Sequence, residues 1–232
     1  MRNTLIIGER YRSRLEAALA ELDIEVMWLC DNPYIDPRLA GHADLSLIRL
    51  DKKIIASRYI IGNDTYVDFL TKRGYDILPA RAAQGKRYPE DCSLCACAAG
   101  NSLIHNLHYT DPAILDFFQG GKIHVSQGYA KCSCCVVDDE SLISADNGIE
   151  QAVGGHNIEL LKINAGGIVL DGFYYGFIGG ASIVLDDAVL FTGRLTDERD
   201  RHRVEAFVRS RGKQPIYLCH GCAFDIGGAV VI

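Results

Sequence analysis

The chain has 232 residues, 48% of them hydrophobic and 23% charged, which is the composition of an ordinary globular protein. The formal net charge is −6 and lysines and arginines form no basic stripe, so nucleic-acid binding has no electrostatic support. Asp171, Asp186 and Asp187 interrupt the most hydrophobic region, so no apolar run reaches membrane-spanning length.

The chain has nine cysteines, an odd number, and its first residues lack the apolar stretch and cleavage site of a signal peptide. This combination indicates free or metal-bound thiols in a reducing cytoplasm. Neither a linker nor a composition break divides the chain, so we expect one domain over residues 1–232. The expected partners are a small-molecule substrate and a second copy in a homodimer, with no nucleic acid and no membrane.

The first regular feature along the chain is an apolar doublet that follows a polar turn. Its five copies begin at Leu5, Ile54, Leu103, Leu142 and Leu190, with steps of 49, 49, 39 and 48 residues. A fixed period in this range is typical of a repeat architecture.

A helix is predicted after each doublet. In the first, Leu15, Ala18, Leu19 and Leu22 lie at the spacing of one helix face. Caps, apolar spacing and glycine stops predict four more, at residues 63–74, 110–120, 149–154 and 204–212.

Each helix is followed by a short strand, a loop and a further strand. The strands after the helices are predicted at residues 25–29, 76–78, 122–125, 158–163 and 215–219. The further strands are predicted at residues 45–50, 95–99, 134–137, 181–185 and 229–232. The fifth copy lacks its outgoing strand, and residues 4–8 supply the missing element. We therefore predict a five-bladed α/β ring, closed by pairing of the N- and C-terminal strands. A doubly wound α/β sheet with accidental spacing is the alternative.

Equivalent loops of a ring meet at its axis, so the loops that precede the further strands should line one pocket. Those loops contain His42 and Asp44, Cys132, and Asp225 followed by Gly227-Gly228. The pocket would then hold an imidazole, carboxylates and thiols. Two longer loops, at residues 81–91 and 165–180, are lids or insertions.

A fivefold ring of this kind resembles the pentein fold of guanidino-group-modifying enzymes, such as arginine and agmatine deiminases, dimethylarginine hydrolases and amidinotransferases. That family carries an acidic residue beside a Gly-Gly pair, a His-x-Asp and a cysteine just before a strand. The counterparts here are Asp225 with Gly227-Gly228, His42-Ala43-Asp44, and Cys132. The resemblance implies an uncharacterised bacterial family of this fold and names Cys132, His42, Asp44 and Asp225 as catalytic.

The order of these motifs differs from the family's order, in which the Gly-Gly copy comes first and the cysteine ends the chain. Read cyclically, the spacing of the copies is preserved, as a circular permutation would leave it, although chance would also explain such short motifs.

The cysteines are compatible with three alternative functions. In the first, Asp44 and Asp225 hold a guanidinium or amidinium cation, Cys132 attacks its carbon, and His42 protonates the leaving amine and then activates water. Lys131 or the cation itself would activate the thiol. The structural alternatives are that Cys132 is a small buried hydrophobe and His42 a core histidine.

The second function is a zinc or iron–sulfur site built from two C-x-x-C pairs, Cys92 with Cys95 and Cys219 with Cys222. In that case the thiols serve as soft metal ligands. The third is a non-catalytic binding ring whose cysteines are merely tolerated in a reducing cell.

Overall fold

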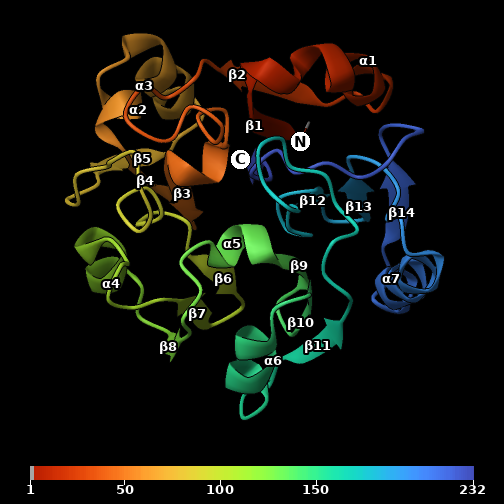
Figure 1. Cartoon of the computed structure of the whole chain (residues 1–232). Helices are drawn as coiled ribbons and strands as arrows, with labels where there is room; N and C mark the ends of the chain where they lie inside the picture. Colours follow the sequence, from red (N-terminus) through yellow and green to blue (C-terminus); the bar gives the residue numbers. More distant parts are fainter. Residues whose placement is uncertain (1–2) are drawn as a thin grey trace.

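The computed structural model describes residues 3–232, and its strands form five sheets of three strands each. In every sheet the middle strand pairs antiparallel with one neighbour and parallel with the other. In sheet order the strands are β15 (Val230–Val231), β1 (Thr4–Gly8) and β2 (Glu25–Leu29); β3 (Leu47–Leu50), β4 (Lys53–Ala56) and β5 (Asp76–Pro79); β6 (Cys97–Ala99), β7 (Ser102–His105) and β8 (Gly121–His124); β9 (Cys134–Asp138), β10 (Ser141–Ser144) and β11 (Glu159–Lys162); β12 (Ser182–Val184), β13 (Ala188–Phe191) and β14 (Gln214–Tyr217). The sheets fit the predicted fivefold repeat, and Figure 1 shows them arranged around a common centre.

The first sheet joins the two ends of the described chain. β1 pairs with β15 on one side, with Leu5 opposite Val231 and Ile6 opposite Val230, and with β2 on the other. The predicted pairing of the terminal strands is therefore confirmed. Within residues 3–232 no strand pairing joins one sheet to the next, so no continuous sheet closes the circle.

The helices connect each middle strand to the outer strand that follows it. They are the 3-10 helix η1 (Glu9–Tyr11) with α1 (Arg12–Glu21), α2 (Arg58–Ile61) with α3 (Asp64–Thr71), α4 (Pro112–Phe117), α6 (Asn147–Val153) and α7 (Glu198–Ser210). The side chains of Asn63 and Asp111 cap α3 and α4, because each accepts hydrogen bonds from the first backbone N–H groups of its helix. In the described part of the chain, no helix is both long and apolar enough to span a bilayer.

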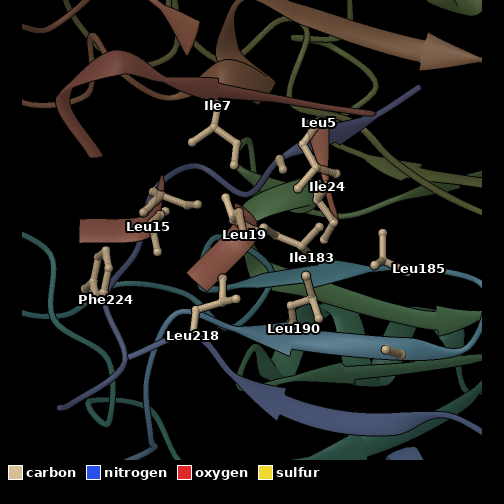
Figure 2. Packing of buried hydrophobic residues seen from close by; sticks show 13 residues of the cluster. Leu5, Ile7, Leu15, Leu19, Ile24, Ile183, Leu185, Leu190, Leu218 and Phe224 are labelled. Atoms are coloured by element: carbon tan, nitrogen blue, oxygen red, sulfur yellow. The ribbon is translucent and has the colours of Figure 1, made fainter. Parts of the chain in front are cut away.

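Five clusters of buried hydrophobic side chains lie between neighbouring sheets. The cluster in Figure 2 joins the first sheet, through Leu5 and Ile7, to the fifth, through Ile183 and Leu190, and α1 covers it with Leu15. The other four clusters join the first sheet to the second, the second to the third, the third to the fourth and the fourth to the fifth. Packing of apolar side chains, rather than hydrogen bonding, thus links the sheets into one structure.

A sixth cluster lies under the loops at the centre. Its buried members include Leu39, Leu45, Cys92, Cys95 and Cys132, which come from three distant parts of the chain. This cluster supports the candidate site.

One buried histidine fixes the loop that leads to Cys132. His105 is fully buried, and its ring nitrogens lie 2.7 Å from Thr110 Oγ1 and 2.6 Å from Gly128 O. Burial lowers the pKa of His105 to about 4. His105 therefore stays neutral in the folded protein at neutral pH.

This histidine should make the protein sensitive to acid. The unfolded chain takes up the His105 proton near its ordinary pKa of 6.5, whereas the folded chain resists it. Stability that is fully present above that value is then lost as the pH falls towards 4, by about 3 kcal/mol. Urea unfolding at about pH 7 and pH 4.5 measures the loss, which should shrink in His105→Gln and persist in the exposed control His156→Gln. An unchanged pH slope in His105→Gln would contradict this origin.

Candidate active site

Cys132 lies in the four-residue helix α5 (Ala130–Ser133), which leads into β9 near the centre of the molecule (Figure 1). Its side chain is buried, and Sγ donates a hydrogen bond of 2.8 Å to Asp44 Oδ2. A second thiol, Cys95 Sγ, lies 3.9 Å from Cys132 Sγ and 3.5 Å from the same carboxylate oxygen. The backbone of Lys131 donates to Cys95 O, which fixes α5 against this segment. Two thiols and one carboxylate are therefore in direct contact.

His42 and Asp44 are positioned by the 3-10 helix η2 (Ala43–Leu45) just before β3. Both side chains are buried, at 2% and 3% exposure. Within the described residues, His42 Nε2 and Asp44 Oδ1 have no hydrogen-bond partner. His42, Asp44 and Cys132 each have one potential metal-ligand atom, and these three atoms lie within 4.8 Å of one another. Buried polar atoms without partners are rare in native proteins, so their gathering here marks a site for a ligand.

Asp225 is held by backbone groups of two loops. Its Oδ2 accepts a hydrogen bond from Phe177 N and its Oδ1 from Gly227 N, both at 2.8 Å. A Cβ added at Gly180 would lie 1.9 Å from Asp225 Oδ1, so only glycine allows the carboxylate this close to the neighbouring loop. The carboxylate is thus fixed before any ligand enters.

His42, Cys132 and Asp225 line one cavity of about 250 Å³. Most of the remaining wall is apolar or aromatic, and its members include Leu39, Leu45, Tyr129, Leu170, Tyr175 and Phe177. The cavity therefore combines a polar end with an apolar remainder, which is the usual character of a small-molecule site.

The surroundings of Cys132 keep its thiol protonated in the empty site. The hydrogen-bonded contact between Cys132 and Cys95 raises the pKa of Cys132 well above its ordinary value, and burial and the Asp44 carboxylate act in the same direction. Burial likewise raises the pKa of Asp44 and of Cys95. A thiolate at Cys132 consequently needs a positive charge to arrive.

We expect this protonation to be visible in alkylation rates. Iodoacetamide, a neutral reagent, should label Cys132 slowly near pH 7 and about tenfold faster per pH unit through pH 9, because only the thiolate reacts. Peptide mass spectrometry follows Cys132 and the exposed Cys222 in the same sample. Fast labelling of Cys132 at neutral pH, independent of pH, would contradict the raised pKa.

A second cavity, of about 260 Å³, is lined by residues of β3, β6, β9, β12 and β15, one strand from each sheet. Asp44 and Lys131 line this cavity, and none of its lining residues lines the first. Burial lowers the pKa of Lys131, but Asp44 and the surrounding thiols outweigh it, so its pKa lies above the ordinary value. Lys131 is therefore a charged ammonium on the far side of Asp44.

A family model described as "Family of unknown function (DUF6873)" matches residues 6–230. The chain belongs to the DUF6873 family. No curated protein matches the sequence of this DUF6873 protein.

Solved structures resemble the DUF6873 chain in fold. ArgZ, an arginine dihydrolase from the ornithine–ammonia cycle in cyanobacteria, is 9% identical over 99% of this chain, with a TM-score of 0.58. The DUF6873 chain spans 40% of that ArgZ chain and 95% of the product-bound N-terminal domain of ArgZ, with a TM-score of 0.56 and 10% identity for the latter.

Two further structures belong to different enzymes. Agmatine deiminase from C. jejuni has a TM-score of 0.53 at 8% identity, over 94% of this chain and 87% of its own. SxtG, an amidinotransferase from Microseira wollei in the saxitoxin biosynthetic pathway, has a TM-score of 0.57 at 8% identity, over 94% of this chain and 88% of its own. These solved structures are members of the pentein superfamily, and the DUF6873 chain shares their mixed α/β fold of small sheets and helices.

The DUF6873 structure brings together the four residues expected to be catalytic. Cys132, His42 and Asp225 line the same cavity, and Asp44 is hydrogen-bonded to Cys132. The neighbour that the sequence did not assign to this group is Cys95. Cys95 begins the strand predicted at residues 95–99, one repeat before Cys132, and this position could have placed it in the same group. The C-x-x-C spacing instead favours the interpretation of Cys95 as a metal ligand.

The four-cysteine metal site requires correction, because the two C-x-x-C pairs do not meet. Cys92 and Cys95 are buried in the cluster beneath the first cavity. Cys219 packs beside α1, where its Sγ donates to Arg14 O, and Cys222 is exposed. Cys219 and Cys222 lie before the loop that contains Asp225 rather than in it. Among residues 3–232, the group of three with metal-ligating geometry is His42, Asp44 and Cys132.

Proposed function

We propose that this protein is a thiol-dependent hydrolase or transferase that acts on a C–N bond of a guanidine or amidine. The observation that carries the proposal is the buried cavity where Cys132, His42 and Asp225 meet, with Asp44 bonded to the thiol. The arginine dihydrolase, agmatine deiminase and amidinotransferase named above share the fold and support this reaction class. Cysteine-to-serine variants of two such enzymes are known with substrate bound, which fits a cysteine nucleophile.

The proposal takes the five sheets as a closed pentein ring with the site at its axis. Two observations support the ring. The hydrophobic clusters join each sheet to the next, including the fifth to the first. The second cavity is lined by one strand of every sheet. Cys132, His42, Asp44 and Asp225 come from loops that meet at this axis.

Substrate binding depends on the carboxylates. A planar cation placed over Cys132 Sγ would lie beside Asp225, with the Asp44 carboxylate held against the thiol from the other cavity. Its positive charge favours the thiolate form of Cys132, which the empty site disfavours. The thiol proton passes to Asp44 Oδ2, the acceptor it already contacts. The nucleophile is therefore released only when a cation is present.

The reaction then proceeds in two displacements. The Cys132 thiolate bonds to the amidinium carbon, and the leaving amine departs with a proton from His42 Nε2, which faces no other partner. A cationic thioester-like adduct remains on Sγ. Water attacks its carbon and gives one proton to His42. As the C–S bond breaks, the remaining hydroxyl proton of the adduct passes to the departing sulfur, which restores the thiol, and a neutral urea or amide is released. In a transferase, an amine replaces this water.

A metal-binding function is the second candidate, because His42, Asp44 and Cys132 also suit a small divalent ion such as zinc. The two functions are mutually exclusive, since a coordinated thiolate is not free to attack. Metal analysis of protein purified without oxygen distinguishes them. A stoichiometric metal supports the second function, and a metal-free protein removes it.

The test of the enzyme proposal is release of ammonia or urea from a panel of guanidines and amidines, combined with labelling by 2-chloroacetamidine. We expect turnover of at least one compound and a single label on Cys132. Absence of turnover across the panel, together with labelling at other cysteines only, would reject the proposal.

A further inference from the structure

We propose that the ligand of this site is a guanidinium or amidinium cation whose substituent is apolar and uncharged, as in an alkyl- or arylguanidine. The inference rests on the proposed function, and it adds the class of substrate. It follows from what lines the cavity beyond the reacting group and from how the nearby charged side chains are already used.

The part of the cavity away from Cys132 offers apolar surface. Leu39, Leu45 and Leu170 line it together with aromatic side chains of two loops. The ring of Phe177 meets that of Tyr175 edge to face, with centroids 6.2 Å apart. A charged substituent in this space would lose its hydration without gaining a partner, whereas an alkyl or aryl group gains favourable contact.

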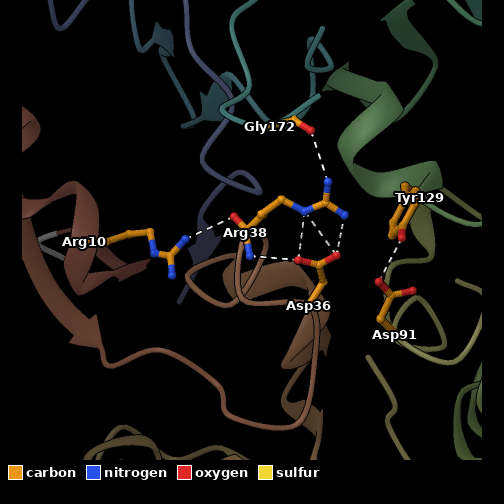
Figure 3. Close-up of polar contacts among 6 residues, drawn as sticks. All are labelled: Arg10, Asp36, Arg38, Asp91, Tyr129 and Gly172. Carbon is orange, nitrogen blue, oxygen red and sulfur yellow. Dashed lines mark hydrogen bonds and ion pairs between the residues drawn. The ribbon is translucent and has the colours of Figure 1, made fainter. Parts of the chain in front are cut away.

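The cavity has no cation for a substrate carboxylate. Within residues 3–232, neither lysine nor arginine lines it. One candidate beside the cavity is Arg38, whose guanidinium donates to both oxygens of Asp36 and to Gly172 O, as Figure 3 shows. It also lies over the ring of Phe173, 4.3 Å from the centroid. Arg38 is therefore paired with Asp36 and bound to the backbone of the loop at Gly172.

A second nearby cation is engaged in the same way. Arg10 is paired with Asp31 and donates to the carbonyls of Pro37 and Arg38. Lys131 lines the other cavity. Among the residues that line the cavity, an α-amino acid such as arginine would therefore find no counter-ion for its carboxylate.

The cavity likewise has no spare carboxylate for a substrate with a second positive charge. Asp225 is the carboxylate that lines the cavity in the described chain, and it belongs to the reacting end. The nearby Asp91 accepts a hydrogen bond of 2.9 Å from Tyr129 OH (Figure 3). A diamine derivative such as agmatine would therefore find no further carboxylate in the cavity lining for its distal ammonium.

The rim of the cavity indicates what covers the substituent. Phe173, Tyr174 and Tyr175 all line the cavity, yet they are exposed, and Tyr174 is entirely in solvent. Exposed neighbouring aromatics are unfavourable in water unless a ligand covers them. An aryl or alkyl group in the cavity would contact these rings, and the cation beside it would gain from their faces. The volume of about 250 Å³ suits a small substituent.

Calorimetry tests the ligand class on the whole chain, with the Cys132→Ser variant used to prevent turnover. Benzylguanidine should bind at least about tenfold more tightly than arginine or agmatine. Tyr175→Ala should weaken the binding of benzylguanidine about tenfold and leave the affinity for unsubstituted guanidinium unchanged. Tyr34→Ala, which lies outside the cavity, should change neither affinity. Leu170→Arg should improve binding of arginine relative to benzylguanidine.

The two proposals fail in different ways. Equal or tighter binding of arginine or agmatine, or no binding of benzylguanidine, overturns the ligand class. Ammonia release by the unmodified protein is measured separately. Tight benzylguanidine binding without turnover of any guanidine overturns the enzyme proposal and keeps the ligand class.

Discussion

Replacing Cys132 by serine is expected to lower turnover of every guanidine substrate by a factor of about 10⁴ or more. A serine hydroxyl at this position has no base strong enough to ionise it, because Asp44 is the one carboxylate that hydrogen-bonds to this position among residues 3–232. The hydroxyl is close in size to the thiol and still donates to Asp44 Oδ2. Substrate affinity and melting temperature should therefore change little, and the loss should appear in kcat rather than in Kd.

Two cysteine variants serve as controls for this result. Cys222→Ser changes an exposed thiol, and Cys135→Ser changes a buried thiol that lines the second cavity. Both should keep kcat within about threefold if their thiols take no part. Turnover by Cys132→Ser within tenfold of the unmodified protein would remove Cys132 from the mechanism.

The second large effect is expected from Gly227→Ala. Gly227 has a φ of +72°, which favours glycine, and an added Cβ would lie 2.4 Å from His42 Cβ. The strain and the forced shift of His42 together should cost about 3 kcal/mol, or about 10 °C in melting temperature for a chain of this length. Displacing His42 should also lower kcat by about 100-fold.

Gly212→Ala separates the two causes. Gly212 has a similar φ of +75°, but nothing lies within 4 Å of its added Cβ. This variant should lose only about 1 kcal/mol and keep full activity. Equal melting temperatures and activities for the two variants would show that the contact with His42 is unimportant. Scanning calorimetry measures the melting temperatures, and ammonia release measures the activities.

Much of the fold could be predicted because each repeat has local sequence patterns that indicate its strands and its helix. The apolar doublets at Leu5 and Leu142 both mark the middle strands of sheets, and Asn63 and Asp111 are helix caps that act within three residues of themselves. The fivefold spacing then placed the terminal strands side by side. Such signals depend on neighbouring residues or on a simple period, so they can be read without knowing the tertiary structure.

The site was predicted in part, and the failures have a common cause. Placing equivalent loops at one axis grouped His42 and Cys132 before any contact was known. That Cys95 touches Cys132 while Cys219 lies beside α1 depends on side-chain direction within each loop, which repeat spacing does not fix. The helix α5 is one turn long, which is too short to show an apolar period, so it could not be predicted from the sequence.

The hydrogen bond between Cys132 and Asp44 joins two separate spaces, since one partner lines the first cavity and the other lines the second. A hydrogen ion passed from sulfur to oxygen therefore leaves the chamber occupied by the organic molecule and arrives beside the ammonium of Lys131. In the proposed mechanism the organic reactant and that hydrogen ion therefore end in two different cavities.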